Sequence, residues 1–235
     1  MKESLEDRKI IASALKKSVI FSALRENELA LIIPFFQKID FKNGEYIFME
    51  GDPSGWLYIV AGKRVKILKH TIAGKDIILE MKVPGEMFCC SKVMDNKPYD
   101  ESAQSKGDVS AIRIRRTDLL KLIDNYPILK VGLTQYLNER LKDAYEMMQN
   151  IATEIVERRI AAVLLKLSEK AGVESKNYSK IDFPLTRREI ADMVGATTET
   201  AIRTMSRLEK RGIVKSSRNR ILVKDEALKQ LLNLE

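Results

Sequence analysis

The sequence is poor in the residues that build metal and redox centres, since its 235 residues include two cysteines and one histidine. Cys89 and Cys90 are adjacent, and neighbouring cysteines rarely bridge each other, so no disulfide framework is expected. Two cysteines cannot supply the four ligands of an iron–sulfur cluster within one chain. Metal-dependent catalysis in a small β-roll needs two or three histidines with a carboxylate. Because His70 is the single histidine, we expect no enzyme.

Long apolar runs are also missing, and no stretch reaches the roughly 20 residues that cross a bilayer. Residues 1–4 contain no apolar signal-peptide segment. We therefore expect a cytoplasmic protein without a membrane partner. Hydrophobic residues make up 45% of the chain and charged residues 31%, which suffices for two soluble domains with packed cores.

The net charge is +8, and its location is more informative than its size. Residues 187–224 hold ten Lys or Arg and four Asp or Glu, a net charge of +6 in 38 residues. Such a concentration of basic side chains is typical of a surface that binds nucleic-acid phosphates.

Short β patterns punctuated by glycine follow a few short helices that end near residue 36. Short β-rich runs of three or four residues occur at 46–48, 57–60, 65–68, 77–79 and 109–112. Glycines separate them, at Gly44, Gly51, Gly62, Gly74 and Gly85. Short strands joined by glycine turns favour an antiparallel sandwich or roll.

A helical period replaces the β pattern after about residue 118. Six residues spaced 4, 3, 4, 3 and 4 apart form an a/d heptad seam: Leu137, Leu141, Ala144, Met148, Ile151 and Ile155. A helix packed on its own domain is the alternative. A parallel pairing of two such helices would present two DNA-binding units together, so we predict a homodimer.

Start and stop signals of two short helices come next. Thr186 and Glu189 have the spacing of a capping box, and Gly195 is an expected helix stop. A second helix begins at 197 or 198, which completes a helix-turn-helix. Residues 213–215 and 221–223 then alternate with period two around a basic tip, which predicts a β-hairpin wing.

The predicted fold class is α+β. We expect an N-terminal antiparallel β-roll of the jelly-roll kind over residues 1–117, a linker and dimerisation helix over 118–156, and a winged helix-turn-helix over 157–235. This order of parts indicates a DNA-binding regulator.

Several motifs resemble the CRP/FNR family of transcription regulators. The runs 159–165, 185–191 and 195–203 are similar to the family's DNA-binding domain, and the glycines up to Pro84-Gly85-Glu86-Met87-Phe88 resemble its cyclic-nucleotide-binding-like roll. The resemblance covers residues 20 to 225. It implies a homodimer on two-fold symmetric double-stranded DNA, activation through RNA polymerase, and control by a small-molecule or gas effector in the roll.

The resemblance also implies roles for residues of the second helix. Glu199 and Arg203 stand where the family reads G·C pairs, while Thr198 and Ile202 occupy variable reading positions. A salt bridge between Glu199 and Arg203 is the alternative to base reading. The positions that match phosphate contacts are Arg187, Thr197, Thr200, Ser217 and Arg218, with Arg220 as an addition.

The sensor motif departs from the family's cyclic-nucleotide pattern. Cys90 stands where cyclic-AMP binders carry a ribose-binding glutamate, and Asp100 or Glu101 stands where they carry a phosphate-binding arginine. A carboxylate cannot hold a phosphate without a cation between them. Ala144 and Tyr145 replace an adenine-contacting Thr–Ser pair. The resemblance therefore disfavours a cyclic nucleotide as effector.

The run Gly85–Cys89 is similar to one in carbon-monoxide-sensing haem regulators, whose cysteine is an axial ligand of the iron. Cys89 is thus a candidate haem ligand, with Met87 and Cys90 as further candidates for contact with an effector. Thiol redox chemistry, a small apolar metabolite, and cysteines that serve only in packing stay open. So does a constitutive regulator with a vestigial pocket.

A non-specific architectural DNA binder is the rival class of function. Such a protein needs basic charge but no pair of side chains that reads bases. Glu199 and Arg203 are both present, which favours the sequence-specific regulator.

Overall fold

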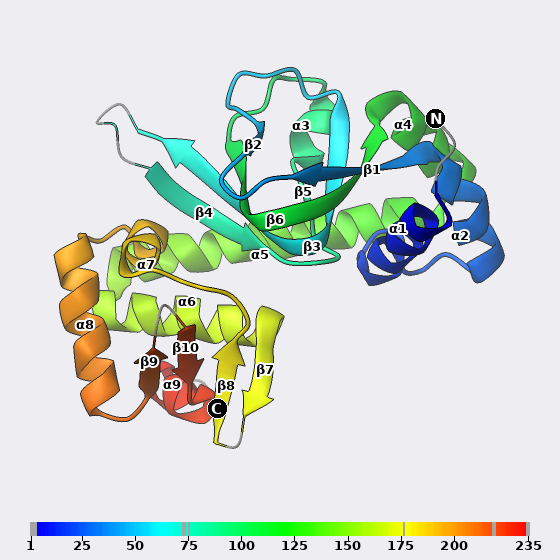
Figure 1. Ribbon diagram of the computed structural model, residues 1–235. Helices are drawn as coiled ribbons and strands as arrows, with labels where there is room; N and C mark the ends of the chain where they lie inside the picture. Colours follow the sequence, from blue (N-terminus) through cyan, green and yellow to red (C-terminus); the bar gives the residue numbers. More distant parts are fainter. Residues whose placement is uncertain (1–3, 72–73, 75, 176, 218–219, 234–235) are drawn as a thin grey trace. The chain divides into compact units, whose positions relative to one another are not determined.

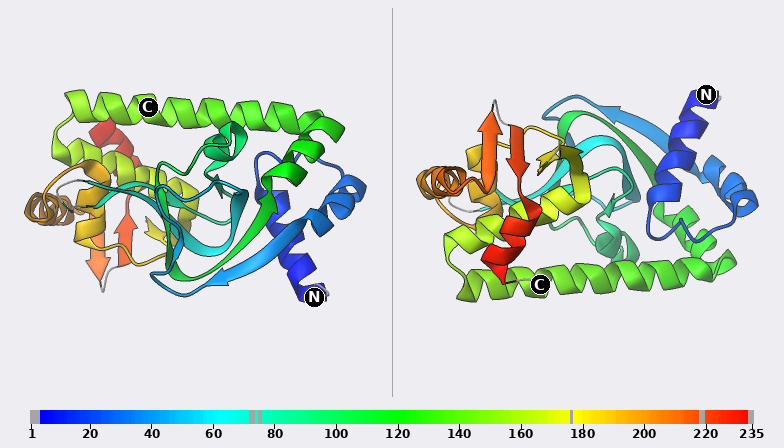
Figure 2. Two further views of the ribbon diagram at one scale, coloured as in Figure 1. Left: turned by 90° about the horizontal axis from the view of Figure 1, so that it is seen from above. Right: turned by 90° about the horizontal axis from the view of Figure 1, so that it is seen from below.

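The computed structural model describes residues 4–71, 74, 76–175, 177–217 and 220–233 (Figure 1). The chain divides into two compact units, Met1–Lys142 and Asp143–Glu235. Helix α5, Ile128–Thr153, crosses this boundary, and Figure 2 shows it as one continuous helix. None of the helices in the described part of the chain is long and apolar enough to cross a membrane.

An antiparallel β-roll forms the first unit, as the sequence predicted. Its sheet has the strand order β1-β6-β3-β4, and β2 pairs with β6 while β5 pairs with β3. The strands are β1 (Phe36–Phe41), β2 (Tyr46–Phe48), β3 (Trp56–His70), β4 (Asp76–Lys82), β5 (Met87–Phe88) and β6 (Ser102–Arg115). The helices are α1 (Leu5–Lys17), α2 (Glu26–Ile32), the 3₁₀ turn η1 (Ile33–Phe35), α3 (Cys90–Asp95) and α4 (Arg116–Asn125).

The prediction of a turn at Gly62 was wrong. Strand β3 continues through this residue, and its register with β6 shifts on both sides of it, so the glycine marks an irregularity in one long strand. His70 is the last residue of β3, and its Nδ1 lies 2.7 Å from Oδ1 of Asp76. Gly85 does form a turn, with φ of 94°, and a Cβ there would lie 2.6 Å from Cβ of Lys17.

Four aromatic side chains fill the roll beside β5. The rings of Phe48 and Tyr99 stack at 3.9 Å between centroids, and those of Tyr58 and Phe88 at 5.4 Å. The Tyr99 hydroxyl donates to the carbonyl of Trp56 at 2.8 Å. Burial in this cluster raises the pKa of the Tyr99 hydroxyl.

A winged helix-turn-helix forms the second unit, again as predicted. Its elements are α6 (Val156–Ala171), β7 (Gly172–Ser175), β8 (Tyr178–Ile181), α7 (Arg187–Val194), α8 (Thr198–Lys210), β9 (Val214–Ser217), β10 (Arg220–Val223) and α9 (Asp225–Leu232). The antiparallel sheet has the order β7-β8-β10-β9. Strands β7 and β8 were not predicted, because four residues each are too few to show a period. Helix α9 was overlooked, although its apolar residues do follow a helical period.

Candidate nucleic-acid interface and sensor site

The first helix of the helix-turn-helix is held by the predicted capping box. The amide of Glu189 donates to Oγ1 of Thr186 at 3.2 Å, and the amide of Thr186 donates to Oε2 of Glu189 at 3.0 Å. Gly195 ends α7 with φ of 64°, a left-handed conformation that favours glycine. These local bonds define the turn that leads into α8.

Helix α8 has one buried and one exposed face. Thr197 caps it, with its Oγ1 accepting from the amide of Thr200 at 3.2 Å. The buried side chains are Ala201, Thr204, Met205 and Leu208. The four predicted base-reading residues, Thr198, Glu199, Ile202 and Arg203, are all exposed. The helix therefore presents these four to a ligand and keeps its apolar side for packing.

Glu199 and Arg203 form a weak ion pair on that face. Their charged groups lie 4.0 Å apart, and the side chains are 83% and 80% exposed. A solvated pair at this distance contributes little free energy, so it would not hold either group away from a base edge.

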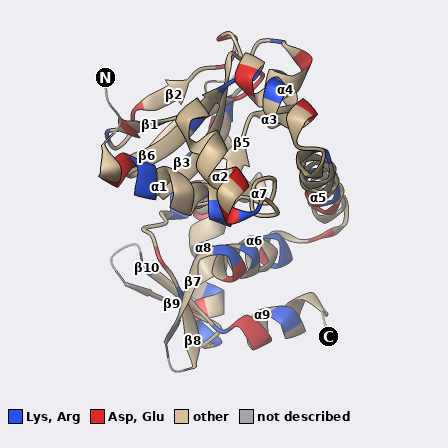
Figure 3. Cartoon of the chain, turned by 90° about the vertical axis from the view of Figure 1, so that its right-hand side faces the viewer, with Lys and Arg blue, Asp and Glu red and all other residues tan. Residues whose placement is uncertain are grey.

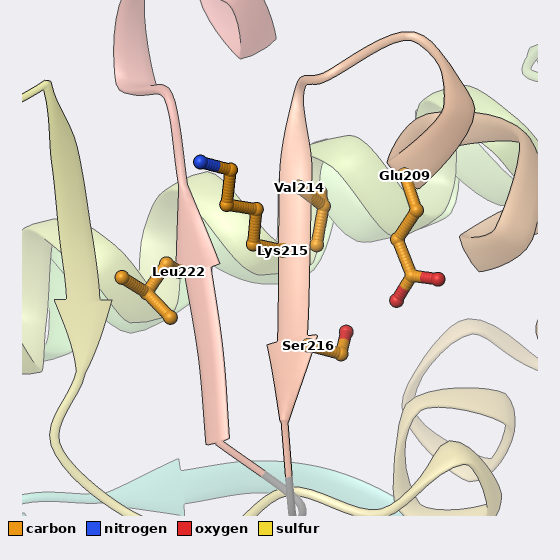
Figure 4. Close-up of a pocket in the computed structure, with 5 residues that line it drawn as sticks. All are labelled: Glu209, Val214, Lys215, Ser216 and Leu222. Carbon is orange, nitrogen blue, oxygen red and sulfur yellow. The ribbon is translucent and has the colours of Figure 1, made fainter.

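Arg187, predicted to contact phosphate, is bound within the protein. Its Nη2 lies 2.7 Å from Oε1 of Glu209 and 2.8 Å from Oγ of Ser216. Figure 4 shows Glu209 and Ser216 on the same side of β9, where they line a surface pocket with Val214, Lys215 and Leu222. Arg220 is exposed at the start of β10. Arg218 and the side chain of Ser217 lie outside the described residues.

The apolar seam of α5 is exposed in the single chain. Leu137, Leu141, Met148 and Ile151 are 41–65% exposed, which is unusual for a row of large apolar side chains on one helix. Ala144 is exposed as well. The prediction that Ile155 continues this helix was wrong, because α5 ends at Thr153 and Ile155 is the N-cap of α6 in extended conformation.

Cys89 and Cys90 lie in the interior of the roll. They are 5% and 2% exposed, and both are free thiols. Cys89 has φ of 63°, a rare left-handed conformation for a residue with a Cβ. Its thiol donates to Oε1 of Glu101 at 3.6 Å. Burial raises the pKa of both thiols, and that of Cys90 reaches about 12.

A group of four side chains links the roll to α5 beside these cysteines. The buried Lys82 at the end of β4 pairs with Glu80, and Glu80 also pairs with Arg140 of α5. The Lys82 ammonium lies 5.9 Å from the ring centroid of Tyr136. Burial raises the pKa of the Tyr136 hydroxyl to about 12. We call Glu80, Lys82, Tyr136 and Arg140 the strut.

Sequence reasoning missed the strut. Nothing in the heptad pattern distinguishes Tyr136 and Arg140 from other positions beside the seam. Glu80 and Lys82 alternate with apolar residues along β4, and that pattern predicts exposed charges rather than a buried pair. Only the packing of α5 against β4 brings the four together.

Comparison with known proteins gives two family matches and several whole-chain relatives. A family model described as a Crp-like helix-turn-helix domain matches residues 158–231, and one described as a cyclic nucleotide-binding domain matches residues 38–126. The "CRP-like cAMP-activated global transcriptional regulator" of Mycobacterium tuberculosis is 28% identical over 90% of this chain and 94% of its own length. The "Cyclic AMP receptor protein" of Thermus thermophilus is 28% identical over 91% and 96%. The chain belongs to the CRP/FNR family of transcription regulators.

The solved structure of FixK2 from Bradyrhizobium japonicum agrees with this fold. It matches with a TM-score of 0.75 and 23% identity, over 83% of this chain and 96% of that one. As a CRP/FNR-family member, the chain is a DNA-binding transcription regulator and not an enzyme. Lys and Arg occur in both of its units (Figure 3), so net charge alone does not mark the DNA-binding surface.

Haem ligation through Cys89 would require a change in the interior of the roll. In the metal-free chain, burial and the carboxylate of Glu101 raise the pKa of the Cys89 thiol, and iron bound at this sulfur would have to displace its 3.6 Å contact with Oε1 of Glu101. The backbone carbonyl of Met87 is engaged by the hydroxyl of Tyr136, and the Met87 side chain is buried. The same raised pKa values disfavour reactive thiols, since redox-active cysteines have lowered ones.

Proposed function

We propose that this CRP/FNR-family regulator works as a homodimer whose roll responds to an effector other than a cyclic nucleotide, and that it activates transcription through contacts with RNA polymerase. The observation that carries the choice of effector is a carboxylate, that of Asp100 or Glu101, in the position of the family's phosphate-binding arginine. The nearby buried cation, Lys82, is already neutralised by Glu80. A cyclic phosphate would therefore meet a carboxylate without a free cation to compensate it.

The names of two relatives favour a competing function, in which the effector is cyclic AMP. Both the mycobacterial and the Thermus protein are named for cyclic AMP. At 28% identity a shared fold can hold different ligands, because specificity depends on a few side chains in the pocket. Cyclic AMP is therefore the ligand to test first.

The strut and the Tyr136–Met87 hydrogen bond connect the roll to helix α5. These contacts support a model in which a change in the roll alters the position of α5. An effector that binds beside β5 better in one arrangement of α5 than in another would shift the population between the two. Because α5 also carries the exposed seam, this shift would change how two copies pair. It would thereby change how the two α8 helices meet the two half-sites on DNA.

Calorimetric titration of the full chain with cyclic AMP and with cyclic GMP tests the proposal. We expect no binding heat up to millimolar ligand. A dissociation constant in the micromolar range for either nucleotide would overturn the proposal and favour the competing function.

An absorption spectrum after incubation with haem, with and without dithionite, tests whether the roll binds haem through Cys89. We expect no thiolate-type ferric spectrum. A thiolate-type spectrum that Cys89→Ser abolishes and Cys90→Ser retains would show that the roll rearranges to bind haem, against our interpretation.

A further inference from the structure

Glu157 binds two arginines at the C-terminal end of helix α8 at once, Arg207 within the helix and Arg211 at its C-cap. Its Oε1 lies 2.5 Å from Nη1 of Arg211, and its Oε2 lies 3.7 Å from Nη1 of Arg207. The Glu157 side chain is only 14% exposed, whereas those of Arg207 and Arg211 are 64% and 51% exposed. Solvent screens a largely buried carboxylate with two cationic partners less than it screens the exposed pair of Glu199 and Arg203.

The two arginines lie at the C-terminal end of α8. Arg207 follows Arg203 by four residues, so both lie on the same side of the helix. Arg203 has only the weak, solvated contact with Glu199. The cation in the predicted base-reading half of α8 is thus available to DNA, while the two at the other end share the single carboxylate of Glu157.

Glu157 also lies directly after the junction of the long helix. Helix α5 ends at Thr153, Ile155 caps α6, and Glu157 is in the first turn of α6. A second set of contacts holds this turn, because Arg158 binds Glu154 at 2.9 Å and the carbonyl of Leu232 at 2.8 Å. The same carboxylate therefore ties the recognition helix to the segment where the dimer helix ends.

We infer that Glu157 is a positioning residue for sequence recognition: it fastens the C-terminal end of α8 to the start of α6 and withholds Arg207 and Arg211 from non-specific phosphate contacts. This inference rests on the reading of bases by α8. Free arginines beside a DNA-binding helix increase affinity for any sequence, because each new phosphate contact adds to counterion release. The specificity ratio falls when binding to random DNA rises.

Glu157→Gln in the full chain tests the inference, because glutamine keeps the size of the side chain and removes the charge. A preferred duplex is first obtained by selection from a random library with the unaltered protein. Dissociation constants are then measured on this duplex and on a random duplex of equal length at several salt concentrations. We expect binding to random DNA to tighten several-fold, a specificity ratio about ten times lower, and a salt slope steeper by about one to two.

Two further variants keep the result interpretable. Glu226→Gln removes a carboxylate that pairs with Lys229 on α9, away from α8, and should leave the ratio unchanged. Adding Arg207→Gln and Arg211→Gln to Glu157→Gln removes the released cations and should return random binding and the salt slope to their original values. A variant that is merely misfolded would not be rescued in this way.

The outcomes are distinct. If Glu157→Gln leaves both the specificity ratio and the salt slope unchanged while the unaltered protein prefers its selected duplex, the inference about Glu157 is wrong and base reading stands. If the unaltered protein prefers no duplex, base reading by α8 is wrong, and the inference falls with it.

Discussion

The hydroxyl of Tyr136 donates a hydrogen bond to the backbone carbonyl of Met87, with 3.1 Å between the oxygens. Tyr136 belongs to the long helix α5, and Met87 begins the short strand β5 that precedes the two cysteines. The Gly85–Cys89 run and helix α5 are therefore joined by a polar contact that does not depend on the identity of the Met87 side chain.

Removal of this hydroxyl should weaken the first unit without unfolding it. For Tyr136→Phe we expect the free energy of unfolding to fall by about 1 kcal/mol, because one buried carbonyl loses its donor. Urea denaturation measures the loss. Tyr145→Phe is the matched control, since Tyr145 lies on the same helix and is 62% exposed. Equal effects of the two substitutions would argue against the contact.

Gly132 marks the close approach of α5 to the N-terminal segment. A Cβ at this position would lie 2.9 Å from Cα of Ile20 and 3.0 Å from its carbonyl oxygen. Gly132→Ala would gain helix propensity, worth up to about 1 kcal/mol, but backbone atoms cannot move aside cheaply. We expect a net destabilisation of about 1–3 kcal/mol. Gly55→Ala, where no atom lies within 4 Å, should change the stability little.

A charge in the exposed seam should prevent pairing of two copies. Leu141→Glu would place two carboxylates opposite each other in an apolar interface, so we expect a monomer in sedimentation and strongly weakened DNA binding. Asn138→Glu adds the same charge to an exposed position beside the seam and should remain dimeric. A dimeric Leu141→Glu protein would show that another surface holds the copies together.

Substitutions in α8 and in the wing should separate base reading from phosphate contact. Arg203→Ala should cost about 1–3 kcal/mol on the preferred duplex and relax the preference at one base pair. Arg220→Ala should weaken binding to all sequences about equally and reduce the salt slope by about one. Equal weakening of preferred and random DNA by Arg203→Ala would mean that α8 does not read bases through this residue.

The buried thiol of Cys90 predicts a pH dependence of stability. Its pKa is about 12 in the folded chain against about 9 when exposed, so the unfolded chain releases this proton first as the pH rises. The stabilisation is complete below pH 9 and is lost between about pH 9 and pH 12, by up to about 1.4 kcal/mol per pH unit. Urea unfolding between pH 8 and pH 11 should show a shallower decline for Cys90→Ala. Identical slopes would contradict the burial of the thiol.

Local sequence determined the helix-turn-helix. The capping box of Thr186 and Glu189, the stop at Gly195 and the cap at Thr197 each involve residues three to four positions apart, and all are present in the structure. The exposed face of α8 follows from its period for the same reason. These short-range hydrogen bonds do not depend on the rest of the chain, so the local sequence is enough to predict them.

Tertiary structure decided the burial and the neighbours of the charged groups and of the thiols. Arg187 looked free for phosphate, but Glu209 and Ser216 approach it from segments more than 20 residues away. The burial of Lys82 against Tyr136, and of Cys89 against Glu101, depends on contacts that cross the roll. The pKa of a group and its availability depend on which distant groups surround it, and only the folded chain specifies those neighbours.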